Sequence, residues 1–308
     1  MSDALAPWNA SLTLAEHSII VYALAVAGLA LFAFFVKSLV STKEITQRYR
    51  PSVYAGMCIT GVAFLSYVVL VLAFTFGYER DGDTWVPNAT AVLSWAPRYF
   101  DWTVTVPLLV IELLAVATLA GATARRARAV GVGAAFLMIS TGFIGGVVID
   151  SGTNMGALWL WGVISGLFMV VLYVLVIYVV VKSSRDLKGT AVPATLRNAG
   201  ILLIVTWFAY PIVFGLQGWG HGGAIITWMQ VVLSAADIVA KVGFGSMIHK
   251  IAKIRSAHDV EQGVDTHPES VWVSSEKLAD AAPPAPAPLR TVAATDASGT
   301  RGGRAPRR

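Results

Sequence analysis

The sequence predicts an all-α membrane protein: a bundle of seven transmembrane helices with the N-terminus outside and the C-terminus in the cytoplasm. Of its 308 residues, 56% are hydrophobic and only 13% are charged, which is too apolar for the surface of a soluble domain. Seven stretches also reach the roughly 20 mostly apolar residues that cross a bilayer. We therefore expect a multi-pass protein of the plasma membrane, with the lipid bilayer as its main partner.

The seven predicted spans are residues 17–40, 53–77, 97–120, 127–149, 157–181, 196–217 and 223–251. Loops rich in Lys and Arg stay in the cytoplasm, and here they alternate with acidic loops. The basic set is Lys37, Lys43, Arg48, Arg50, Arg125, Arg126, Arg128, Lys182, Arg185, Lys188, Arg197, Lys250, Lys253 and Arg255. The opposite loops carry Glu79, Asp81, Asp83 and Asp150, with Arg80 as an isolated cation. An odd number of spans then puts the two termini on opposite sides.

Composition also argues against nucleic-acid binding, disulfide chemistry and metal binding. The net charge is +5, but most basic residues flank apolar segments, so nucleic acid is not an expected partner. Cys58 is the one cysteine; no intramolecular disulfide can form, and we expect a core thiol. No metal site is expected. Residues 1–255 form the predicted membrane domain, and the polar, Pro/Ala-rich residues 256–308 a disordered cytoplasmic tail.

Ionisable residues inside the spans are the main functional signal, because a charge at membrane depth is costly and usually functional. Lys241 lies deep in the last span, too far from an interface to snorkel easily. Asp237 comes four residues earlier, on the same helix face and one turn nearer the outside. The spacing fits a functional ion pair and a structural salt bridge equally well.

The third span carries RYFDWTVTVPLLVIE, with Arg98, Asp101, Thr105 and Glu112. Eleven residues bring Asp101 and Glu112 to within about 20° of one face and about 16 Å apart along the axis. They would be proton-exchanging groups on opposite sides of the membrane centre, with Asp101 on the outer side. Thr105 can donate to Asp101 or back to its own helix. Glu112 can be a proton donor or a protonated core acid.

Together these residues resemble the microbial rhodopsins, particularly the bacterial proton pumps similar to proteorhodopsin and xanthorhodopsin. The most specific stretches are RYFDWTVTVPLL, WFAYP and DIVAKVGFG, and the resemblance covers all seven spans. It implies a light-driven outward proton pump, not an enzyme, with all-trans-retinal bound covalently to Lys241. Asp101 is then the primary counterion and proton acceptor, Asp237 the second counterion and Glu112 the cytoplasmic proton donor. A photosensor signalling through a partner or its tail, and a non-retinal transporter or receptor, remain as alternatives.

The resemblance also implies the residues around the chromophore. As a bare pattern, an aromatic stripe is more often ordinary core, but these aromatics fall within the family motifs. The implied retinal contacts are Trp102, Met138, Gly142, Ser165, Trp207, Tyr210 and Phe214. Tyr67 matches a tyrosine near the counterions, Arg98 balances their charge, and Leu109 accompanies green absorption in similar pumps.

Three features depart from the family pattern. Ser66 stands where many such pumps carry a histidine bonded to the counterion, and residues 217–229 contain no glutamate pair. In WGVISG, one alignment puts Gly162 at the glycine that opens a carotenoid window in xanthorhodopsins, whereas a shift of one residue puts Trp161 there. The first alignment favours a carotenoid antenna, and the second does not. Relatives commonly form trimers or pentamers, so we expect a homo-oligomer.

Overall fold

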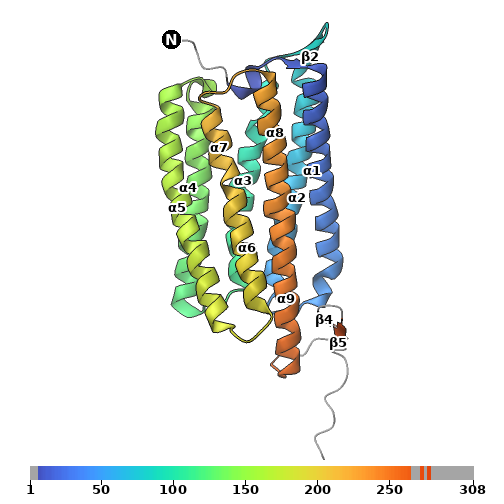
Figure 1. Ribbon diagram of the computed structural model, residues 1–308, viewed down its shortest axis with the longest axis vertical. Helices are drawn as coiled ribbons and strands as arrows, with labels where there is room; N and C mark the ends of the chain where they lie inside the picture. The colour runs from blue at the N-terminus through green and yellow to red at the C-terminus, as the bar shows by residue number, and fades with distance from the viewer. Residues whose placement is uncertain (1–5, 265–270, 274–275, 279–308) are drawn as a thin grey trace, which may run out of the picture.

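The computed structural model describes residues 6–264, 271–273 and 276–278, and they form a bundle of seven up-and-down segments (Figure 1). The first five segments are α1 (Leu14–Ser41), α2 (Arg50–Phe76), α3 (Ala96–Ala115), α4 (Gly121–Phe143) and α5 (Met155–Asp186). The sixth is α6 (Val192–Trp207) with α7 (Ala209–Leu216), and the seventh is α8 (Gly223–Asp237), a π-helix (Ile238–Gly243) and α9 (Phe244–Glu261). The predicted helical membrane bundle is confirmed.

Six of these segments are long and apolar enough to cross a membrane. The remaining one, α3, carries Arg98, Asp101 and Glu112 within its 20 residues, so its composition alone does not mark it as a span. Large apolar side chains such as Leu29, Leu65 and Leu160 face outward, as the bilayer requires of a membrane protein's outer surface.

Several boundaries differ from the predicted ones. The third helix ends at Ala115 rather than 120, and the last one continues to Glu261, past the expected domain boundary at 255. Two short antiparallel strands, β4 (Val271–Val273) and β5 (Glu276–Leu278), lie within the expected tail; residues 279–308 are outside the described residues. The expected core thiol is wrong, because Cys58 is exposed on the outer surface of α2.

Two of the segments are interrupted for identifiable reasons. The sixth breaks at Phe208, because Pro211 lacks the N–H that would bond the carbonyl of Trp207. The seventh widens into the π-helix that contains Lys241, and such local π-helices often occur at functional sites.

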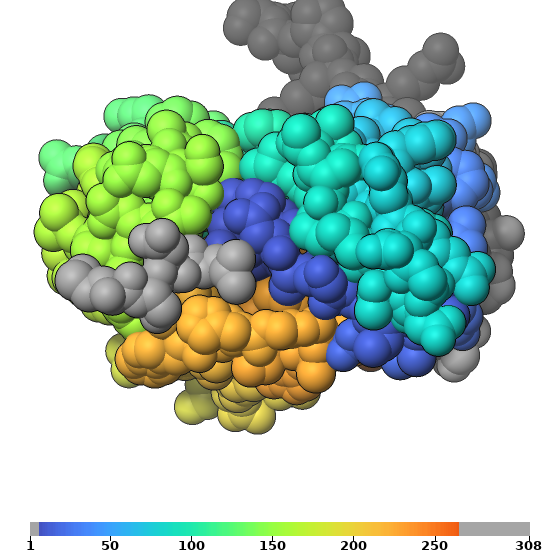
Figure 2. Space-filling view, turned by 90° about the horizontal axis from the view of Figure 1, so that it is seen from above, coloured from blue at the N-terminus to red at the C-terminus, as the bar shows by residue number. Residues whose placement is uncertain are grey.

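The end of the bundle that carries the N-terminus is closed by extended structure. The strands β1 (Leu12–Thr13), β2 (Tyr78–Asp81) and β3 (Thr84–Pro87) form an antiparallel sheet in the order β1-β3-β2. A 3₁₀ turn, η1 (Pro7–Asn9), lies in the middle of this face, in dark blue in Figure 2. Its Trp8 is buried, so the N-terminal segment covers the bundle at this end.

The opposite end is held by a polar cluster around Asp259. The Tyr49 hydroxyl donates to Asp259 at 2.9 Å, and Arg48 bonds the same carboxylate at 3.1 Å. Burial, assisted by that carboxylate, raises the pKa of Tyr49 to about 12. Arg255 packs on the Tyr49 ring and donates to the carbonyls of Val116 and Ala117. The end of α9 is thereby tied to the end of α3.

Candidate functional site

The centre of the bundle holds a buried amine between two carboxylates. Lys241, 2% exposed, donates from Nζ to Asp101 Oδ2 at 2.5 Å and lies 3.5 Å from Asp237 Oδ2. Its position in the π-helix brings it to α3, which supplies Asp101. The two acids that the sequence placed near Lys241 therefore both contact it, and a cation at this nitrogen is neutralised within the bundle.

Asp237 is fixed by donors on both of its oxygens. Tyr67 donates to Oδ2 at 2.9 Å, while Tyr210 and Trp102 Nε1 donate to Oδ1 at 2.7 and 3.2 Å. Such bonds stabilise the ionised carboxylate. Asp237 is therefore well suited to remain a permanent negative charge.

Only one carboxylate oxygen of Asp101 has a hydrogen-bond partner. Its Oδ2 meets Lys241, but its Oδ1 is buried without a hydrogen-bond partner. Thr105 Oγ1 is likewise buried and makes no hydrogen bond of ordinary geometry, although its hydroxyl lies close enough to act on the Asp101 carboxyl. Of the two carboxylates, Asp101 keeps the free lone pairs that can take up a proton.

Arg98, expected to balance the charge of the counterions, lies beside the second of them, Asp237. Its Nη1 lies 3.7 Å from Asp237 Oδ2 and donates to the Tyr67 hydroxyl at 3.0 Å. Gln230 Oε1 accepts from Nε at 3.2 Å and from Nη2 at 2.7 Å. Sequence reasoning missed Gln230, although its spacing of seven residues before Asp237 is a same-face signal.

Ser66 does not take over the histidine's contact to the counterion. Its hydroxyl donates to the carbonyl of Pro97 at 3.0 Å, within the bundle but away from the carboxylates' own hydrogen bonds. Asp101 thus has no side-chain donor from position 66.

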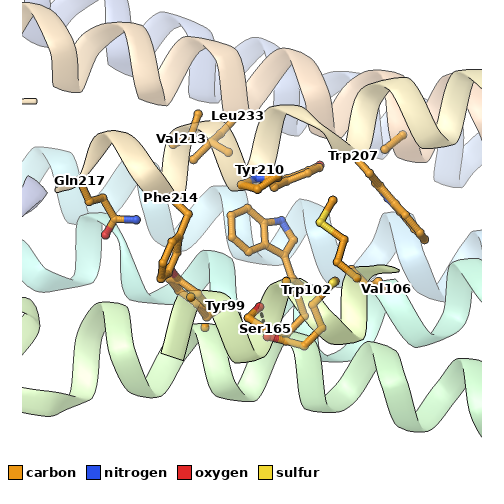
Figure 3. A pocket seen from close by; sticks show the side chains of 18 of the residues that line it. Tyr99, Trp102, Val106, Ser165, Trp207, Tyr210, Val213, Phe214, Gln217 and Leu233 are labelled. Atoms are coloured by element: carbon orange, nitrogen blue, oxygen red, sulfur yellow. Dashed lines mark hydrogen bonds between the residues drawn. The ribbon is translucent and has the colours of Figure 1, made fainter. Parts of the chain in front are cut away.

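An apolar cavity lined in part by Lys241 lies between α3, α4, α5 and the sixth segment. Figure 3 shows the side chains that surround it. It is lined by all the predicted cofactor contacts: Lys241, Trp102, Met138, Gly142, Ser165, Trp207, Tyr210 and Phe214. Leu109 also lines it, as do several residues that sequence reasoning did not single out: Trp95, Tyr99, Val106, Ile139, Met169, Val213, Gln217 and Leu233.

Small residues also line this cavity. Gly162 lines it, and a Cβ at this position would fall 2.6 Å from Phe214 Cε1. Trp161 instead packs against Gly145, where an added Cβ would lie 2.5 Å from Trp161 Cβ. Ser165 donates to the carbonyl of Met138 at 2.7 Å. Of the two alternatives at WGVISG, Gly162 is therefore the residue beside the cavity.

Glu112 lies apart from Asp101 and Lys241. It follows Asp101 by 11 residues, or about 16 Å, along α3. Its side chain is 3% exposed, and its Oε2 has no partner. It borders a small separate cavity, together with Gly56, Gly245 and His249. The structure thus keeps the two acids of α3 in different compartments.

These residues fit a retinal Schiff base. A primary amine, that of Lys241, lines a cavity rich in aromatic side chains, and the unpartnered Oδ1 of Asp101 adds acceptor capacity beside the amine. An amine in this setting can condense with an aldehyde, and the carboxylates can balance the resulting cation. Fold and site together define the class of seven-helix retinal proteins.

The comparisons agree with that class. The model of the family described as bacteriorhodopsin-like protein matches residues 14–254, so the chain belongs to the bacteriorhodopsin-like family. It is 32% identical to the bacteriorhodopsin of Haloterrigena sp. (strain arg-4), over 62% of this chain and 70% of that one. The family implies covalently bound retinal, and its members are light-driven pumps or sensors, not enzymes.

Two solved structures share the fold at 26% identity. Thermophilic rhodopsin has a TM-score of 0.74, and xanthorhodopsin, described as a light-driven ion pump with dual chromophore, has 0.71. Each match covers 81% of this chain and 98% of the other. The resemblance inferred from the motifs is confirmed, and the protein is a multi-pass protein of the cell membrane.

Proposed function

We propose that this protein is a light-driven outward proton pump with retinal bound to Lys241. One observation carries the proposal: Asp101 contacts the Lys241 nitrogen, while a second acid on the same helix, Glu112, is buried in a separate cavity. This arrangement provides an acceptor and a donor on opposite sides of one nitrogen.

The roles of the counterions follow from their hydrogen bonds. When bound, retinal supplies light absorption and a change of shape that displaces the proton on the Lys241 nitrogen. Asp101 accepts that proton, because its carboxylate lies 2.5 Å from the nitrogen and keeps an oxygen free. Asp237 stays ionised, because Tyr67, Tyr210 and Trp102 all donate to it.

Glu112 then returns a proton to the nitrogen from the other side. A buried carboxyl group with an unpartnered oxygen favours its neutral form, which is the form that a donor needs. Net transport runs from Glu112 towards Asp101. With the basic loops in the cytoplasm, this direction is outward.

The similarity to xanthorhodopsin supports ion pumping by this chain. We also predict a carotenoid antenna, because xanthorhodopsin has a dual chromophore and Gly162 lies beside the cavity. Energy transfer from an added carotenoid, measured in the excitation spectrum of retinal fluorescence, tests it. The homo-oligomer, a trimer or a pentamer, remains a prediction that native mass spectrometry can test.

Light-induced acidification of a suspension of cells making the protein tests the pump itself. We expect acidification that an uncoupler abolishes. A pigment that absorbs light but moves no protons would instead favour the photosensor.

A further inference from the structure

The small cavity beside Glu112 contains a second titratable group, His249. The two side chains come from α3 and α9, and Ser38, Ser52 and Gly56 complete the wall on the α1 and α2 side. His249 is 7% exposed, and its Nε2 is buried without a hydrogen-bond partner. Glu112 Oε2 is unpartnered in the same cavity. Two unsatisfied polar atoms around one enclosed space are unusual in a folded protein and call for a functional explanation.

The geometry orders these groups along the membrane. A Cβ at Gly245 would lie 3.4 Å from Glu112 Oε1, and His249 follows Gly245 by four residues. Four residues are about one turn, or about 6 Å, along the same face of α9. His249 is therefore one turn beyond Glu112, on the side away from Lys241.

We propose that His249 relays protons from the cytoplasm to Glu112. This rests on the proposed pump function and adds the residue through which the donor is recharged. An imidazole suits the role because it accepts a proton at one nitrogen and releases one from the other. The transfer is balanced: His249 takes a proton from the cytoplasmic side and passes one to the Glu112 carboxylate.

Two lysines lie near His249, on the side from which the proton would arrive. Lys37 of α1 and Lys253 of α9 act electrostatically on the imidazole. Lys253 is paired with Glu44, and Lys37 lies over the Phe34 ring at 4.9 Å. Among the residues that the structure describes, Lys37, Lys253 and Glu112 are the charged or titratable groups placed against His249. Glu44 acts on it through its pair with Lys253, so a pH profile of proton uptake must be interpreted with all four groups in view.

The test is the rate of light-driven proton uptake, followed with a pH-sensitive dye, in full-length retinal-loaded protein. We expect His249→Gln to keep the pigment spectrum but slow uptake by about 100-fold, the lower end of what a positioned general acid or base contributes. Added imidazole should accelerate uptake in His249→Gly and leave the unsubstituted protein unchanged. The exposed histidine further along α9, His258, is the matched control, and His258→Gln should behave like the unsubstituted protein.

A second readout needs no light. In darkness, the ring-nitrogen NMR signals of His249 should shift in Glu112→Gln, because the two groups share one cavity. Unchanged uptake in His249→Gln, slowing without imidazole rescue, or unshifted NMR signals would each overturn the relay. If the unsubstituted protein takes up no protons in light, the pump proposal itself fails, which is a distinguishable result.

Discussion

Gln230 holds the buried guanidinium of Arg98 with a single oxygen, accepting from Nε at 3.2 Å and from Nη2 at 2.7 Å. Its own amide group donates to the carbonyl of Ser94 at 3.2 Å. The amide thereby links α8 to the turn that precedes α3 and helps to hold the cation 3.7 Å from Asp237.

Gln230→Met should destabilise the pigment. The substitution conserves side-chain length but removes two bonds to a charged group, each worth about 1.5–3 kcal/mol. Arg98 Nε is then buried without its acceptor, and Nη2 keeps only the Ser234 hydroxyl at 3.4 Å. We expect faster thermal bleaching and an altered pH dependence of the absorption maximum. Gln217→Met is the control, since Gln217 lines the cavity without contacting Arg98; equal bleaching rates in the two variants would contradict this account.

Asp101→Asn should keep the pigment and abolish proton transport. The amide fills the same space but cannot accept the proton from the Lys241 nitrogen. Light-induced acidification in liposomes or cells is the measurement. Asp83→Asn, which changes an exposed acid in the β2–β3 turn, should pump normally. Transport at the normal rate in Asp101→Asn would show that another group is the acceptor.

Glu112→Gln should slow the late part of the photocycle and the steady pumping rate, while the first proton transfer stays fast. The reason is that Glu112 borders its own cavity and makes no contact with Asp101 or Lys241. Flash photolysis separates the two phases. If both phases slow together, the two acids do not act in sequence.

The glycines of α5 allow a matched test of the cavity's shape. In Gly162→Ala the new methyl group would fall 2.6 Å from Phe214, whereas a Cβ at Gly166 meets nothing within 4 Å. Both glycines line the cavity. Overpacking of this kind costs about 1–3 kcal/mol, so we expect Gly162→Ala to slow retinal binding and shift the absorption maximum, and Gly166→Ala to change neither. Similar binding rates would mean that Phe214 does not border the chromophore.

Much of the site could be predicted because the third span follows helical periodicity. The 11-residue interval between Asp101 and Glu112 needed only the geometry of a regular helix. The ion-pair spacing of Asp237 and Lys241 was readable in the same way, and it survives the π-helix with a separation of 3.5 Å.

The rest depends on contacts between segments distant in the sequence, which periodicity does not contain. The partners of Arg98 are set by how α8 packs against α3, since Gln230 and Asp237 both lie on α8. The β2–β3 hairpin was not predicted, because an acidic, charged loop has no apolar alternation to indicate strands. In the sequence, His249 is only one residue of an apolar span. Its proposed role as a proton relay follows from the cavity that it shares with Glu112.

The central claim is that Lys241 forms a pigment with retinal, and the visible spectrum after adding all-trans-retinal to the purified protein tests it most directly. We predict a strong visible band in the unsubstituted protein and none in Lys241→Ala, with the free aldehyde's near-ultraviolet band remaining in the variant. A protein that stays transparent to visible light, or a Lys241→Ala variant that colours equally, would contradict the account.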